Sequence, residues 1–114
     1  MSTQPAIEFI DDITGFRAPN AFIARLGGPL RRKAELLNAL ALALIFPKYF
    51  GRNWDALEEC LRDLSWLGDN RPVVLLHKQM PLARRTQRLL YLDILKKAVL
   101  AHGGRLRVIF PAAS

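Results

Sequence analysis

The chain has 114 residues, of which 51% are hydrophobic and 24% charged, and its formal net charge at pH 7 is +7. This length and composition predict one globular domain with a packed core and exclude a largely disordered chain. The only cysteine, Cys60, excludes an internal disulfide and a cysteine-based metal site. We expect a cytoplasmic protein without contact to a membrane, because residues 1–20 are too polar for a signal peptide or a transmembrane helix.

The first half of the chain predicts one strand and one helix. Residues 1–20 keep neither the helical nor the strand period for long, and we interpret them as an N-terminal extension, with room for a short helix or strand, packed on a domain of residues 21–114. Residues 21–26 predict a strand that ends at two glycines. Residues 30–44 are good helix formers with leucines on one face, and Pro47 stops that helix. Gly51 marks a sharp bend in the loop that follows.

The second half alternates helices with strands. Asn53 is a favoured N-cap type for a helix that extends to about residue 64. Residues 72–77 form a nearly continuous apolar run, typical of a central parallel strand covered on both faces. Residues 79–101 predict a helix, for which we allow a break near residues 84–86 as an alternative that would make two helices, and residues 105–110 predict a last strand. This order indicates an α/β fold with a small parallel sheet.

No pattern in the chain indicates an enzyme. His77 and His102 stand at the end of a predicted strand and of a predicted helix, without a serine or cysteine motif beside them, and we expect both to be structural. Cys60 lies on the inward stripe of its helix and is expected to be buried. The glycine pair before Pro29 offers too few donors to cradle a phosphate. We therefore predict a binding protein that uses no cofactor and no metal.

An acidic segment stands out in this basic chain. Residues 53–63 carry four acids and one base, a net charge of −3, so the rest of the chain carries +10 because the whole carries +7. On a helix, Asp55, Glu58 and Glu59 face outward together, opposite the apolar stripe. Like charges one turn apart are mildly unfavourable on a helix that is merely solvated. The segment therefore favours a binding surface for a cationic partner.

Aromatic residues directly precede these carboxylates. Tyr49, Phe50 and Trp54 flank the bend at Gly51, which would place their rings next to the start of the helix. Aromatic side chains beside charges are typical of the hot spots of protein interfaces. We interpret the loop and the helix start as one surface.

The stretch from Phe46 to Leu61 resembles the signature of the barstar-like family of intracellular ribonuclease inhibitors, in which a proline, an aromatic pair, a glycine, an asparagine and Asp-Ala-Leu open the inhibitory helix. The resemblance implies an α/β fold with a three-stranded parallel sheet packed by about four helices. It also implies that carboxylates at Asp55 and Glu59 enter the cationic active site of a ribonuclease in place of RNA phosphates. The residues expected to bind the partner are Tyr49, Phe50, Gly51, Asn53, Trp54, Asp55, Glu58 and Glu59.

The chain departs from the family pattern in two of these residues and in its charge. Glu59 stands where barstar has an aspartate, and Glu58 where it has a tryptophan, for which Trp66 is a candidate substitute. Barstar is acidic, whereas this chain is basic. We expect weak long-range attraction to a cationic nuclease and binding through short-range pairs, because salt screens charges beyond about 8 Å.

The basic charge supports a second hypothesis, in which the chain binds RNA or a ribonucleoprotein. A third hypothesis is a protein-interaction module that keeps the barstar fold but binds another cationic protein. We expect a monomer when the chain is free. The basic residues of the second hypothesis form three clusters: Arg31-Arg32-Lys33, Arg84-Arg85-Arg88, and Lys96-Lys97 with Arg105 and Arg107.

Overall fold

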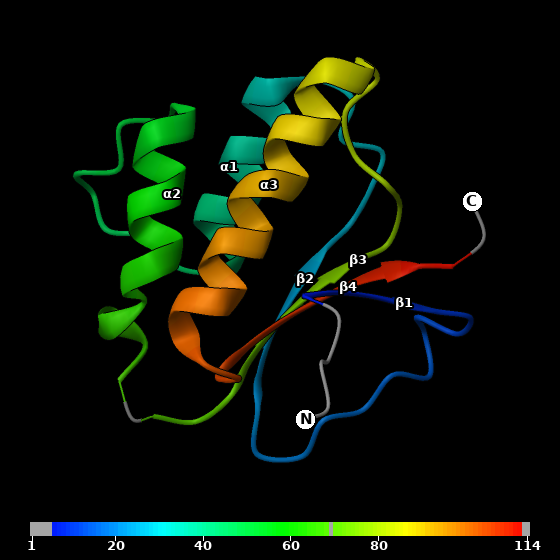
Figure 1. Cartoon of the computed structure of the whole chain (residues 1–114), viewed down its shortest axis with the longest axis vertical. Helices are drawn as coiled ribbons and strands as arrows, with labels where there is room; N and C mark the ends of the chain where they lie inside the picture. Colours follow the sequence, from blue (N-terminus) through cyan, green and yellow to red (C-terminus); the bar gives the residue numbers. More distant parts are fainter. Residues whose placement is uncertain (1–5, 69, 113–114) are drawn as a thin grey trace.

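Four parallel strands form one sheet in the order β1-β4-β3-β2 (Figure 1). The computed structural model describes residues 6–68 and 70–112. The two central strands, β3 and β4, carry most of the buried strand residues, and all five residues of β3 are buried. This confirms the prediction of a central parallel strand at residues 72–77. The strands are β1 (Ile7–Ile10), β2 (Phe22–Leu26), β3 (Val73–His77) and β4 (Leu106–Pro111).

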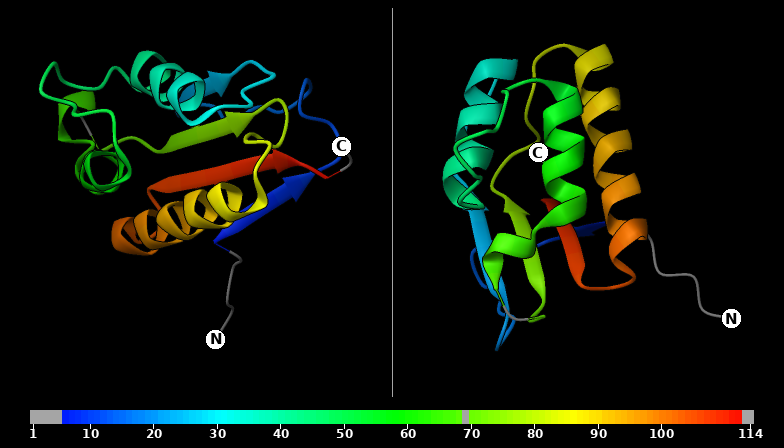
Figure 2. Two further views of the ribbon diagram at one scale, coloured as in Figure 1. Left: turned by 90° about the horizontal axis from the view of Figure 1, so that it is seen from above. Right: turned by 90° about the vertical axis from the view of Figure 1, so that its left-hand side faces the viewer.

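Three α-helices lie on the same side of the sheet (Figure 2). The α1 helix follows β2, α3 follows β3, and α2 packs mainly against α3. The described residues contain one further short 3-10 helix, which follows α2. Within that part of the chain, no helix combines the length and the hydropathy that a membrane crossing requires. The helices are α1 (Lys33–Ala43), α2 (Trp54–Asp63), η1 (Ser65–Leu67) and α3 (Arg85–His102).

Alternate residues of β3 face two different apolar clusters. Val73 and Leu75 join the large core under the helices, whereas Val74 and Leu76 face the opposite side of the sheet. That opposite side is covered by the loop between β1 and β2, which contributes apolar residues such as Ile13 and Phe16. A strand covered on both faces has no polar side, which explains the continuous apolar run.

The prediction of three strands was wrong, because the N-terminal region supplies a fourth. β1 pairs in parallel with β4, from Ile7 opposite Val108 to Ile10 opposite Pro111. Glu8 of β1 also accepts two hydrogen bonds from the Arg107 guanidinium, at 2.9 and 2.8 Å. A strand of four residues is too short to show a period, and its partner lies at the other end of the sequence. Residues 1–5 of the predicted extension lie outside the described residues.

The helices also differ from the prediction of about four. The described residues hold three α-helices and the 3-10 helix η1, and α3 is continuous from Arg85 without the break allowed as an alternative. The α1 helix begins at Lys33, and residues 79–84 are not helical. In place of helical turns, the Leu82 amide donates to the Leu30 carbonyl at 2.7 Å and the Ala83 amide donates to the Arg31 carbonyl at 3.0 Å. These tertiary hydrogen bonds override the helical propensity of both segments.

Candidate partner-binding surface

An aromatic cluster supports the loop between α1 and α2. The Phe46 ring packs edge-on against Phe50 and Trp66, with centroids 4.8 and 5.7 Å apart. The Trp66 indole Nε1 donates a hydrogen bond to the Leu44 carbonyl at 2.9 Å. Trp66 is therefore held beneath the loop and partly buried. It supports the loop, and its suggested role as a substitute ring in the interface stays a prediction.

The bend before α2 is made by Arg52. Arg52 has a φ of 55°, in the left-handed region, whereas Gly51 has no positive φ. The prediction that Gly51 itself makes the bend was thus wrong by one residue. A Cβ on Gly51 would lie 3.4 Å from Asn53 Nδ2 and 3.7 Å from the Ala56 Cβ, which are ordinary contact distances, so neither space nor φ requires a glycine here.

Asn53 caps α2 as predicted. Its side-chain oxygen accepts a hydrogen bond from the Ala56 amide at 2.7 Å, and its own backbone is extended. This bond satisfies one of the amides that a helix start leaves without a partner. The cap therefore sets the position at which α2 begins, and with it the positions of the carboxylates.

The three carboxylates of α2 differ in their surroundings. Asp55 and Glu59 are exposed and lie one helical turn apart, and neither has an ion pair within the described residues. Glu58 is half-buried, and its Oε1 lies 3.6 Å from an Arg62 nitrogen on the next turn. Asp55 stands in the first turn, where the helix dipole favours a negative charge. Within the described residues, Asp55 and Glu59 are thus held without a counter-charge.

The three aromatic residues of the predicted surface also differ. Tyr49 is 75% exposed and stands at the tip of the loop. Phe50 is half-buried in the aromatic cluster described above. Trp54 is half-buried between α1 and α3: its ring lies 6.4 Å from the Tyr91 ring, and the Lys33 Nζ lies 5.2 Å from its centroid. Tyr49 is the aromatic side chain most available to a partner, whereas Phe50 and Trp54 hold the surface in shape.

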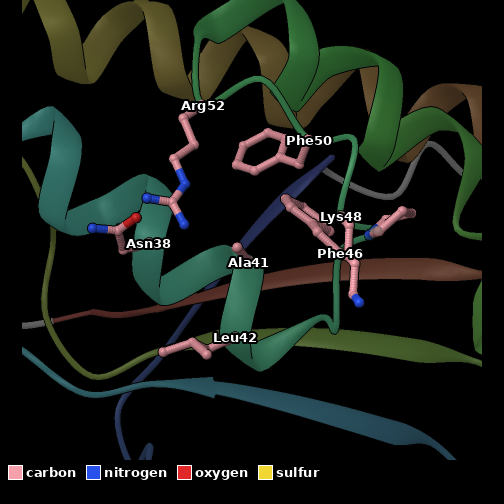
Figure 3. Close-up of a pocket in the computed structure, with 8 residues that line it drawn as sticks. Asn38, Ala41, Leu42, Phe46, Lys48, Phe50 and Arg52 are labelled. Atoms are coloured by element: carbon pink, nitrogen blue, oxygen red, sulfur yellow. The ribbon is translucent and has the colours of Figure 1, made fainter.

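A groove of about 490 Å³ runs between α1 and the loop (Figure 3). Figure 3 shows the Arg52 side chain reaching toward Asn38 of α1, with the Phe50 ring beside it. The groove therefore adjoins the predicted surface, with which it shares Phe50. The sequence patterns did not predict this groove, because its lining residues come from both α1 and the loop. Its lining comprises Asn38, Ala41, Leu42, Phe46, Pro47, Lys48, Phe50 and Arg52.

The histidines and the cysteine have structural roles, as predicted. His77 is buried, and burial lowers its pKa to about 3. The His102 Nε2 lies 2.6 Å from the Leu61 carbonyl oxygen and ties the end of α3 to α2. Cys60 is buried, and desolvation, together with the charges of Asp63 and Glu59, raises the pKa of its thiol. Among the described residues, no group of three histidine, cysteine or acidic side chains is arranged to hold a metal ion.

Comparison with known proteins matches most of the chain to one protein family. The family described as barstar, barnase inhibitor, matches residues 22–110. The chain belongs to the barstar family. The match covers β2 to β4 and contains every residue of the predicted surface, while β1 and the loop after it lie outside. The description names an inhibitor family. No curated protein matches the chain.

Proposed function

We propose that this chain binds a ribonuclease and blocks its active site with Asp55 and Glu59. The observation that carries the proposal is that both carboxylates are exposed, one turn apart, and without an ion pair in the described part of the chain. A ribonuclease active site is built to hold phosphates and is therefore cationic. Two carboxylates on a rigid helix present negative charge in the same way as successive phosphates of a bound RNA.

The rigidity of the surface supports this proposal. The loop is fixed by the Phe46 cluster, and the start of α2 is fixed by the Asn53 cap. Binding then costs little backbone entropy, because the loop and the start of α2 are already in position before the partner arrives. Tyr49 adds an exposed aromatic side chain next to the charges, as interface hot spots often have.

The basic remainder of the chain affects the rate of binding more than the docked complex. At physiological salt, charges more than about 8 Å apart are largely screened, so the docked enzyme experiences mainly the local carboxylates. An approaching cationic enzyme also experiences the positive remainder, which opposes steering. We expect an association rate that changes little with salt, in contrast to the steep acceleration at low salt shown by pairs of opposite net charge.

The test is inhibition of a ribonuclease by the purified chain. The enzyme is obtained by capture from the native cell extract on the immobilised chain, elution at high salt, and detection with a fluorogenic RNA. We expect Asp55→Ala and Glu59→Ala each to weaken inhibition by about 2 kcal/mol or more, because each change leaves a buried cation of the partner unpaired. Glu59→Asp keeps the charge and tests the length of the side chain.

Asp93→Ala is the matched control, since it removes one exposed carboxylate from α3 that already pairs with Lys97 at 3.1 Å. We expect this variant to inhibit like the wild type. Inhibition that survives both α2 substitutions would place the interface elsewhere. Capture of a partner without loss of its nuclease activity would instead favour the protein-interaction module.

A further inference from the structure

Two basic clusters that are distant in the sequence form one patch in the fold. The hydrogen bonds from the Leu82 amide to Leu30 and from the Ala83 amide to Arg31 join the segment before α1 to the segment before α3. Both helices consequently begin at the same end of the molecule (Figure 1). We call the joined residues the basic patch: Arg31, Arg32, Lys33, Arg84, Arg85 and Arg88.

The charge of the basic patch is not neutralised within the described residues. Arg31, Arg32, Arg84 and Arg85 are exposed, and no ion pair involves any of the six side chains there. The nearest carboxylate in the sequence, Glu35, accepts a hydrogen bond from the Arg32 backbone amide at 3.0 Å. Cations gathered in this way repel one another, so the patch costs stability unless an anion binds it.

The third basic cluster of the sequence does not join this patch. Lys97 pairs with Asp93 at 3.1 Å, and Arg107 pairs with Glu8 at 2.8 Å. Arg105 donates to the Arg71 carbonyl at 3.2 Å. These residues lie on the exposed face of α3 and along the sheet. The basic residues therefore fall into two sets. One is the basic patch, and the other is dispersed and partly engaged in ion pairs.

We propose that the basic patch binds the phosphate backbone of a nucleic acid. Five of its six residues are arginines, whose planar guanidinium group matches phosphate with two parallel hydrogen bonds. The first turn of α3 holds no acidic residue, so its backbone amides and the positive end of its dipole add to the patch.

The basic patch and the proposed inhibitory surface share a border at Trp54. Lys33 of the patch lies over the Trp54 ring, and Trp54 directly precedes Asp55. A nucleic acid on the patch thus ends beside the surface that faces the ribonuclease. The binding of nucleic acid does not depend on the proposed inhibition, since the two surfaces use different residues and opposite charges.

The test measures the binding of a short fluorescein-labelled RNA of mixed sequence by fluorescence anisotropy, across salt from roughly 50 to 200 mM. We expect the affinity of the wild type to fall steeply as salt rises, with a slope of about 0.7 per single-stranded phosphate contact. Arg31→Ala/Arg84→Ala/Arg85→Ala should lower this slope by about 0.7 per arginine and weaken binding equally for all sequences. These three side chains are exposed, so we expect the far-ultraviolet circular dichroism to be unchanged.

Arg17→Ala/Lys96→Ala/Lys97→Ala is the matched control, because it removes the same charge from exposed positions outside the patch. We expect it to leave the salt slope near that of the wild type. An equal loss in both triple variants would overturn the proposal, since binding would then follow net charge alone. Labelled DNA of the same sequence, single-stranded and duplex, shows which type of nucleic acid the basic patch binds most tightly.

A labelled polyglutamate peptide of the same charge tests the competing occupant. We expect it to bind more weakly than the RNA. Equal or tighter binding of polyglutamate would overturn the proposal and favour an acidic protein. Asp55→Ala separates this test from the inhibition test, because it should weaken inhibition and leave the binding of RNA intact.

Discussion

The His77 Nε2 lies 2.7 Å from the Tyr91 phenolic oxygen, and both side chains are fully buried. The His77 Nδ1 lies 3.0 Å from the Ile109 carbonyl oxygen, which can only accept. Nδ1 therefore carries the proton, and Nε2 accepts the hydrogen bond of the Tyr91 hydroxyl. The pair links β3 to α3 and β4 in the core, and it holds the imidazole in its neutral form.

The first prediction concerns the dependence of stability on pH. Burial lowers the pKa of His77 from an ordinary value near 6.5 to about 3. Below pH 6.5 the unfolded chain binds a proton that the folded chain does not bind until about pH 3, so acid favours unfolding. We expect the free energy of unfolding to fall by about 1.4 kcal/mol for each pH unit well below 6.5. Urea denaturation between pH 7 and pH 5, above the titration of most carboxylates, measures this slope.

The control for this prediction is His77→Phe, which keeps a ring stacked on Phe110. We expect it to be less stable at pH 7 by about 1 to 3 kcal/mol, because the Tyr91 hydroxyl loses its buried partner. Its stability should depend much less on pH between 7 and 5. A slope equal to that of the wild type would show that other groups carry the effect.

The second prediction concerns the cap of α2. Asn53→Ala removes the hydrogen bond to the Ala56 amide and should lower the free energy of unfolding by about 1 kcal/mol. Asn53→Asp can accept the same bond and should retain most of this stability. Both variants are compared by urea denaturation. The interpretation of Asn53 as the cap fails if alanine is tolerated as well as aspartate.

The third prediction concerns the strained residue in the loop. Arg52 holds a φ of 55°, which is costly for a residue with a Cβ and free of that cost for glycine. We expect Arg52→Gly to raise the free energy of unfolding by up to about 1 kcal/mol, while Arg52→Ala should not raise it. Thermal unfolding of the two variants measures the difference. Equal stability of glycine and alanine here would contradict the left-handed conformation.

The sequence predicted the features that local patterns determine. The apolar run of β3, the cap at Asn53 and the outward direction of Asp55 and Glu59 each follow from a period or a residue preference, and the structure contains all three. The family resemblance rested on the same segment, and the family match confirms it. Local signals were sufficient there because the surface is built from one loop and the helix that follows it.

Contacts between distant segments decided the features that the sequence could not predict. β1 is visible only through its pairing with β4, and residues 79–84 leave the helical conformation because they bond to residues 30–31. The same holds for the aromatic rings, since Trp54 and Trp66 are partly buried by elements far away in the sequence. Composition alone does not distinguish a ring that contacts a partner from one that supports a loop.

The position of β4 between β3 and β1 has a consequence for synthesis of the protein. The last of these four strands to leave the ribosome occupies an interior place in the sheet, and β1, the first to emerge, has no neighbour until then. A nascent chain that stops short of Leu106 therefore exposes an unpaired edge of β3, which invites aggregation. The sheet that carries α3, and α2 through it, is therefore completed only after β4 has been synthesised.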